Sequence, residues 1–256
     1  FVAEEVLQPV PHRQVVFTVP KRLRVFFATD RRRLARLARA GYLTLRQALR
    51  KATPQPPGQP GSIIAIQTFG SLLDFHPNLH CLISWGVFMP EGGFCEPQLG
   101  SLVSSEQLQL AFRERVFKLL LADGAIDLDV VENMRSWEHS GFGAHVGSTV
   151  NVPRQIHTKV VAPDALLSYF VRPPISLARL RLEPDGKVSY QADRFHPKHK
   201  ASVRTFEPTD FLGLLATHIP DPNNRLVAYS GFYSNRVRGE RKKREQPAQD
   251  LGPPLS

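Results

Sequence analysis

The chain has little cysteine and no long apolar stretch. Its two cysteines, Cys81 and Cys95, form no CxxC pair. This excludes the usual zinc ribbon, a dithiol redox motif and a disulfide framework, and indicates reduced thiols in a cytoplasmic protein. No apolar run approaches the roughly 18 residues that cross a bilayer, and no charged-then-apolar leader opens the chain. We therefore expect no membrane partner.

A GxxxxGK[ST] phosphate loop is also missing, so an ATP-driven motor with a nucleotide cofactor is not expected. Positive charge, in contrast, is abundant. The 256 residues include 33 Lys and Arg against 23 acidic residues, with a net charge of +10. Such a balance favours a polyanionic partner, most simply nucleic acid. The alternative is a basic surface that is merely solvated.

The order of the expected elements predicts an α+β fold with a central antiparallel sheet flanked by helices. Residues 1–245 are expected to form one domain, and the Pro-rich residues 246–256 a disordered tail. The hydrophobic and turn patterns predict these elements: strands at 14–19, 62–69, 78–87 and 141–152; helices at 30–51, 104–121, 127–134, 163–171 and 209–218; and a hairpin of 179–182 with 187–191.

The strand at 78–87 alternates in polarity, and this alternation assigns its faces. Leu79, Cys81 and Ile83 point into a core, whereas Asn78 and His80 share the more polar face. The short connection to the strand at 62–69 predicts an antiparallel pair. If the two polar faces coincide, Gln67 approaches His80 across the ladder.

These side chains are candidate ligands for a divalent metal ion. His80, Asn78 and Gln67 together offer one imidazole and two amide oxygens. Read alone, His80 is as well explained as a satisfied histidine on a half-buried strand. His145 is an alternative ligand or general base, whereas His196 and His199 are typical of a basic loop.

Two tyrosines near the C-terminus are candidate nucleophiles. Tyr229 and Tyr233 are four residues apart, so on a helix their phenols would share one face. A phenol has a pKa near 10 and needs assistance, which a cation at the scissile phosphate supplies. The alternative is a pair of aromatic core residues. The basic run that follows is expected either to bind phosphates or to be solvated; it contains Arg236, Arg238, Arg241, Lys242, Lys243 and Arg244.

Several blocks in this order resemble the two-tyrosine rolling-circle transposases of the insertion-sequence-91 type, a branch of the HUH endonucleases. The resemblance runs from Pro9 to Gly239. Its blocks are Pro9-Val-Pro-His-Arg-Gln14, Val19-Pro-Lys-Arg-Leu-Arg24, Thr68-Phe-Gly70, Phe75-His-Pro77 with Leu79-His80, His139-Ser-Gly-Phe142, Arg172-Pro-Pro174, His218-Ile-Pro-Asp221 and Tyr229 to Gly239.

The resemblance implies an HUH-type (ferredoxin-like) sheet and a tyrosine that attacks single-stranded DNA at transposon ends. The products would be a 5′-phosphotyrosine and a free 3′-OH, and a second tyrosine would serve a second strand transfer. Tyr229 and Tyr233 match the tyrosine pair, and His80 matches the second histidine of the His-hydrophobic-His motif. The resemblance also implies a bacterial, nucleoid-associated protein, and a cysteine-rich zinc-binding segment that is missing here, by loss or because the chain is a fragment.

Two positions depart from the family pattern. Asn78 stands where the first motif histidine is expected, and Gln67 where family members often carry histidine. Amide oxygens suit magnesium or manganese better than softer transition metals. His76 is a weaker candidate for compensating Asn78. The departure leaves open a decayed module that binds single-stranded DNA without cutting it, and an unrelated basic RNA-binding protein is a third alternative.

Overall fold

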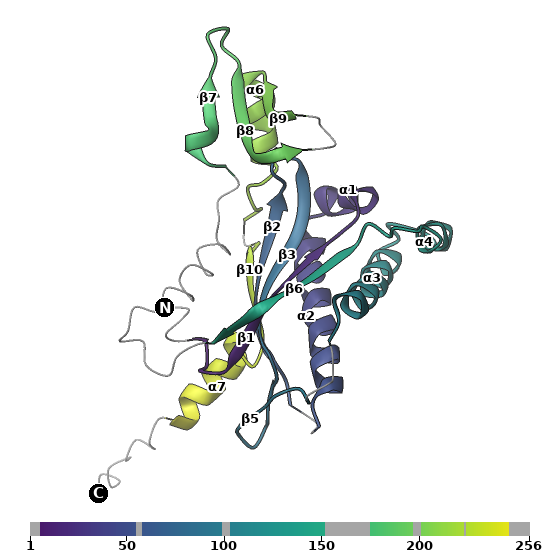
Figure 1. The fold of residues 1–256 in the computed structure, drawn as a ribbon, viewed down its shortest axis with the longest axis vertical. Coiled ribbons are helices and arrows are strands. Elements are labelled where there is room, and N and C mark those ends of the chain that lie inside the picture. The colour runs from purple at the N-terminus through teal and green to yellow at the C-terminus, as the bar shows by residue number, and fades with distance from the viewer. Residues whose placement is uncertain are drawn as a thin grey trace, which may run out of the picture.

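The computed structural model describes residues 6–54, 58–98, 103–151, 175–196, 201–222 and 224–245. Its centre is a five-stranded sheet in the order β10-β2-β3-β1-β6, in which every neighbouring pair is antiparallel (Figure 1). The strands are β1 (Pro11–Thr18), β2 (Gly61–Phe69), β3 (Phe75–Ser84), β6 (Gly143–Asn151) and β10 (Val227–Gly231). With helices alongside, this sheet confirms the predicted α+β class.

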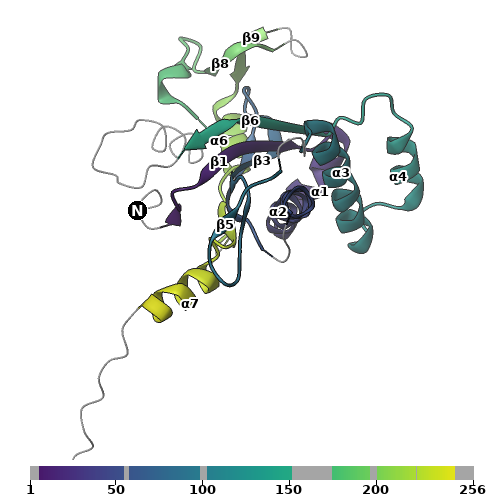
Figure 2. The same cartoon turned by 60° about the horizontal axis from the view of Figure 1, so that its bottom comes forward.

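Four helices lie on one side of the sheet (Figure 2). They are α1 (Lys21–Thr29), α2 (Arg32–Ala52), α3 (Ser105–Ala122) and α4 (Leu128–Arg135). Leu79, Cys81 and Ile83 of β3 are fully buried in the core shared with these helices. The period-2 prediction for β3 is therefore confirmed, and its polar residues are left on the other face.

Local capping explains where the predicted helices begin. The Ser104 hydroxyl accepts from the Gln107 N–H at 3.1 Å, and the Asp127 carboxylate accepts from the Val130 N–H at 2.8 Å. Such side-chain caps satisfy N–H groups that lack helical partners. Asp30, the predicted cap of α2, lies one residue before the actual cap residue, Arg31, and its carboxylate accepts from the Arg32 N–H at 3.1 Å.

A smaller unit stands at one end of the central sheet (Figure 1). It consists of β7 (Leu180–Leu182), β8 (Val188–His196), β9 (Ala201–Phe206) and α6 (Pro208–Ala216). The hairpin of β7 and β8 was predicted, whereas β9 was not. Leu73, from the β2–β3 turn, is fully buried in this unit with Phe206 and Phe211. An Arg204–Asp74 ion pair of 2.8 Å adds a second contact to the same turn.

The remaining elements are short or terminal. A two-stranded ribbon joins β4 (Val87–Phe88) to β5 (Phe94–Cys95), a 3-10 turn spans Leu177–Arg179, and α7 (Asn235–Glu245) follows β10. The helix predicted at 163–171 and the tail at 246–256 lie outside the described residues. Within the described ranges, no helix combines the length and apolarity needed to span a membrane.

Candidate functional site

The three predicted metal ligands lie close together on the face of the sheet away from α1–α4. Gln67 of β2 is directly opposite Asn78 of β3, and His80 is opposite Ala65. The polar faces of the two strands coincide as expected, with Gln67 opposite Asn78 and diagonal to His80. Diagonal Cα atoms are about 7–8 Å apart, within reach of long side chains. All three are buried, with exposed fractions of 9% for Gln67, 8% for Asn78 and 5% for His80.

Only one of the two polar atoms of the Asn78 side-chain amide has a hydrogen-bond partner among the described residues. Its Nδ2 donates to the His76 carbonyl at 3.0 Å, whereas its buried Oδ1 has no partner among the described residues. Leaving a buried acceptor without a partner costs roughly 1–3 kcal/mol. An oxygen-seeking cation would satisfy this atom, so the residues present fit such an ion.

The His80 ring is held in its neutral form. Burial lowers the pKa of His80 to about 4, so the imidazole can act as a ligand at neutral pH. Its Nδ1 lies 3.4 Å from the side-chain amide of Gln14 on β1. The contacting atom of Gln14 is its amide Nε2, which can only donate, so this orientation would leave the ring proton on His80 Nε2. A histidine ligand instead donates from its other ring nitrogen, and Gln14 would support that role with its amide turned so that Oε1 accepts from Nδ1–H. Sequence reasoning assigned Gln14 no role, although it closes the Pro9–Gln14 block.

The described residues contain no ready-made cluster of charged ligands. Across the described ranges, no group of three or more His, Cys, Asp and Glu residues is placed to hold a metal ion. His145 is exposed on β6, opposite Val16, which is itself opposite His80. Two strand spacings, about 10 Å, therefore separate the two histidines. The candidate set remains His80, Asn78 and Gln67, whose two amide oxygens favour magnesium or manganese.

The two tyrosines do not share a helix, so the expected arrangement is corrected. Tyr229 belongs to strand β10, opposite Ile63, and Tyr233 follows the turn after that strand. Gly231 between them has a φ of +60°, and a Cβ there would lie 2.0 Å from the Pro60 carbonyl oxygen. Only glycine fits this left-handed, crowded position. It turns the chain and sends the two side chains to different environments.

Tyr233 is a core residue. Its side chain is fully buried, with Phe88 and Phe232 as aromatic neighbours. His12 Nδ1 lies 2.7 Å from the Val10 carbonyl, so that nitrogen must carry the proton, and Nε2 accepts from the Tyr233 hydroxyl at 2.7 Å. The Gln8 N–H donates to the same phenol oxygen at 3.2 Å. Burial raises the pKa of Tyr233.

Tyr229 is half-buried on the same face as the metal candidates. Its row of the sheet contains Ile63 and Leu82, two residues along β3 from His80. From strand spacing and rise, the Cα atoms of Tyr229 and His80 are about 12 Å apart. Tyr233, beyond Gly231, follows the end of β10 that pairs with Gly61, farther from His80. Tyr229 is thus the tyrosine closer to the candidate site.

Helix α7 contains the predicted phosphate-binding residues. Some of them contact aromatic rings, and the others are exposed to solvent. The Arg238 guanidinium lies 5.2 Å from the centre of the Tyr229 ring, and that of Arg241 lies 4.1 Å from the Phe232 ring. These cation–π contacts hold the helix against β10. Arg236 lies 3.8 Å from Glu240. The exposed side chains of the set are Arg236, Lys242, Lys243 and Arg244.

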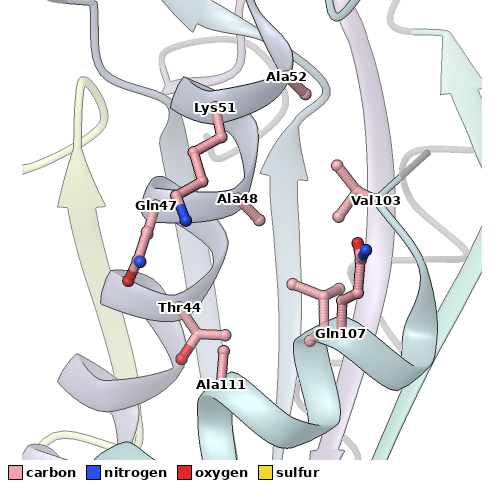
Figure 3. Close-up of a pocket in the computed structure, with 9 residues that line it drawn as sticks. Thr44, Gln47, Ala48, Lys51, Ala52, Val103, Gln107 and Ala111 are labelled. Atoms are coloured by element: carbon pink, nitrogen blue, oxygen red, sulfur yellow. The ribbon is translucent and has the colours of Figure 1, made fainter. Parts of the chain in front are cut away.

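A separate cavity of about 440 Å³ lies between α2 and α3 (Figure 3). Gln47 and Lys51 extend from α2, and Gln107 faces them from α3. It belongs to the helical layer, on the side of the sheet opposite to His80, and contains none of the predicted site residues. We therefore place the candidate site on the other face.

Fold and site together define an α+β protein with imidazole, amide and phenol groups on one sheet face beside a basic helix. Residues 61–241 match the model of a family described as "Putative transposase". Because the match covers more than half of the chain, the chain belongs to this family.

Curated relatives agree with that assignment. The chain is 26% identical over 241 residues to "Putative transposase y4qJ" of Sinorhizobium fredii, a match that covers 89% of the chain and 59% of the relative. It is 25% identical over 250 residues to "Transposase for insertion sequence element IS801" of Pseudomonas savastanoi pv. phaseolicola, covering 91% and 57%. The chain thus spans less than two thirds of these relatives. No solved structure matches.

Proposed function

We propose that this chain cuts and transfers single-stranded DNA in rolling-circle transposition, with Tyr229 as the first nucleophile. The observation that carries the proposal is the shared face of the sheet. Tyr229 of β10, Gln67 of β2, and Asn78 and His80 of β3 all lie on it, by the register of the strands. Membership of a transposase family supports the same reading.

The proposed ligands are His80, Asn78 and Gln67. A magnesium or manganese ion bound there would supply Lewis-acid polarisation of the scissile phosphate. Asn78 Oδ1, which has no partner within the described part of the chain, supports this assignment. Gln14, with its amide turned so that Oε1 accepts from Nδ1–H, would orient the His80 ring. Because the three side chains carry no negative charge, phosphate oxygens of the DNA would contribute much of the affinity for the cation.

In the proposed reaction, Oη of Tyr229 attacks phosphorus, and the bond from phosphorus to the 3′ oxygen breaks. The phenol proton passes to water, and the departing 3′ oxygen takes up a proton to become a 3′-OH. The strand is left joined to Tyr229 through its 5′ phosphate. Arg238, stacked on the ring of Tyr229, is placed to bind that phosphate.

The test is formation of a covalent adduct. Single-stranded DNA with the sequences that flank the gene carries a label at its 3′ end, because the 5′-phosphotyrosine retains the 3′ part of the strand. The protein is incubated with this DNA and Mn²⁺ and run on a denaturing gel. A labelled protein band that is lost in EDTA and in Tyr229→Phe is the expected result. A band that persists in Tyr229→Phe would refute Tyr229 as the nucleophile.

A second candidate function is binding of single-stranded DNA without cleavage. Asn78 in the position of a motif histidine favours this alternative, because an amide is a weaker ligand than imidazole for most transition metals. Intact DNA binding with no adduct in either Mn²⁺ or Mg²⁺ would support it. Asn78→His should then restore cleavage.

A further inference from the structure

A basic pocket lies at the end of the central sheet where α1 begins. Its volume is about 520 Å³, and it is lined by Lys21 and Arg24 of α1, by Gly70, Ser71 and Leu72 of the β2–β3 turn, and by Asp74 and His76. None of these residues belongs to the proposed nucleophile or ligand set.

Three strands lead from the candidate metal site to this pocket. Gly70, just after the end of β2, follows Gln67 by three residues, and His76 precedes Asn78 by two on β3. Thr18 of β1 is directly opposite Asn78, and Lys21 follows it by three residues. Two residues of strand span about 7 Å, so the pocket directly adjoins the site.

The charges around the pocket favour an anion. Asp74, its one carboxylate, is paired with Arg204 of the small unit at 2.8 Å. Lys21 is exposed and Arg24 half-buried, and the first turn of α1 has no acidic residue. Asp74 also attracts Arg24 electrostatically, so its single negative charge is shared between Arg24 and Arg204 and leaves the pocket with a net positive charge. The positive end of the α1 dipole repels the two cationic side chains in its first turn, and a bound anion would offset that repulsion.

We propose that this pocket binds a backbone phosphate of single-stranded DNA, next to the phosphate that lies at Asn78. Lys21 and Arg24 are its cationic contacts, and Ser71 offers a hydroxyl donor. The pocket fixes the strand's position relative to the site and carries no base specificity. That the bound strand is single-stranded DNA rests on the proposed function; the phosphate pocket itself would equally serve a protein that binds without cutting.

The test measures binding in EDTA, so that it does not depend on cleavage. Fluorescence anisotropy of a labelled single-stranded oligonucleotide gives Kd over a range of salt concentrations, for the wild type and for Lys21→Gln/Arg24→Gln. Each phosphate contact contributes about 0.7 to the slope of log K against log salt for single strands. We expect the slope to fall by about 0.7 and Kd at low salt to rise about tenfold.

The matched control is Arg39→Gln/Lys118→Gln, which removes the same two charge types from exposed positions on α2 and α3. Equal losses in the two double variants would overturn the proposal, because the effect would then be net charge alone. Lys21→Gln, an exposed single change, decides the question if the double variant does not fold. An unchanged slope in that variant would also overturn it.

A second arm locates the contact. Oligonucleotides with one neutral methylphosphonate linkage are scanned along the strand. At one position the neutral linkage should weaken binding of the wild type but not of the pocket variant. The same penalty in both proteins at every position would contradict a defined pocket. Adduct formation, measured separately, tests the proposed function and does not enter this result.

Discussion

The two ends of one sheet face differ in chemistry. At one end, Gln67, Asn78 and His80 are buried polar groups, and Asn78 Oδ1 has no partner among the described residues. At the other end, Tyr233 is buried among aromatic rings with its hydroxyl bonded to His12 and Gln8. A satisfied buried polar group stabilises a fold, whereas an unsatisfied one marks a place where a ligand can bind. By this comparison, the end with Asn78 is the candidate binding site and the end with Tyr233 is part of the core.

The largest expected effect concerns the two phenols. Tyr229→Phe should reduce adduct formation at least about a thousandfold, because the nucleophilic oxygen is lost. Tyr233→Phe removes only a buried hydroxyl and should reduce it less than about tenfold. The measurement is the initial rate of adduct formation on 3′-labelled DNA with Mn²⁺. Equal losses in the two variants would mean that both phenols reach the substrate and would break the comparison.

The same two residues should differ in the opposite sense in stability. Tyr233→Ala empties a fully buried aromatic site and should lower the free energy of unfolding by about 3–5 kcal/mol. Tyr229 is half-buried, so Tyr229→Ala should cost about 1–2 kcal/mol. Urea denaturation followed by fluorescence gives both values. A greater loss of stability from Tyr229→Ala than from Tyr233→Ala would show that Tyr229 on β10 contributes more to the packing of this face.

Replacing the amide at the site should change its preference among cations. Asn78→His adds an imidazole beside His80, so Zn²⁺ should displace bound Mn²⁺ at a concentration at least about tenfold lower than in the wild type, because imidazole suits Zn²⁺ whereas amide oxygens suit Mn²⁺. Electron paramagnetic resonance of free Mn²⁺ measures this displacement without reference to activity. Asn133→His, on an exposed turn of α4, is the matched control and should change nothing. An unchanged displacing concentration of Zn²⁺ in Asn78→His would remove Asn78 from the ligand set.

Sequence patterns predicted the central strand pair and the helical core well. The alternation of β3 assigned Leu79, Cys81 and Ile83 to the buried side, because a strand half covered by helices must have a period of two. Caps such as Ser104 marked helix starts, since a short hydroxyl side chain satisfies local N–H groups. Both signals depend only on residues that are close in sequence, so distant contacts formed during folding do not alter them.

Tertiary contacts overrode the prediction for the tyrosines. Spacing of four favours a shared helical face, but Gly231 packs against Pro60 and Tyr42, which are distant in sequence. No local pattern encodes that contact. The pairing of His12 with Tyr233 joins residues 221 positions apart and was invisible for the same reason. Helix α1 was missed because it is short and begins only three residues after the end of β1, with Pro20 at its cap position.

The dependence of stability on pH involves a buried histidine at each end of the face. Burial lowers the pKa of both His12 and His80 to about 4, against an ordinary value of about 6.5 in the unfolded chain. Between those values the unfolded chain binds more protons than the folded one, so acidification from pH 6.5 to 4 should lower stability. Above pH 6.5 neither histidine contributes a slope.

Single variants should resolve the two contributions in EDTA. His80→Asn should flatten the dependence on pH between 6.5 and 4 with little loss at neutral pH. His12→Asn should flatten it and also lower stability at pH 7, because Tyr233 then loses its acceptor. His145→Asn, at an exposed position, is the control for the substitution itself. If His12→Asn leaves the free energy of unfolding at pH 7 unchanged, the His12–Tyr233 hydrogen bond does not stabilise the aromatic end. The contrast between Tyr233 and Tyr229 would then depend on burial alone.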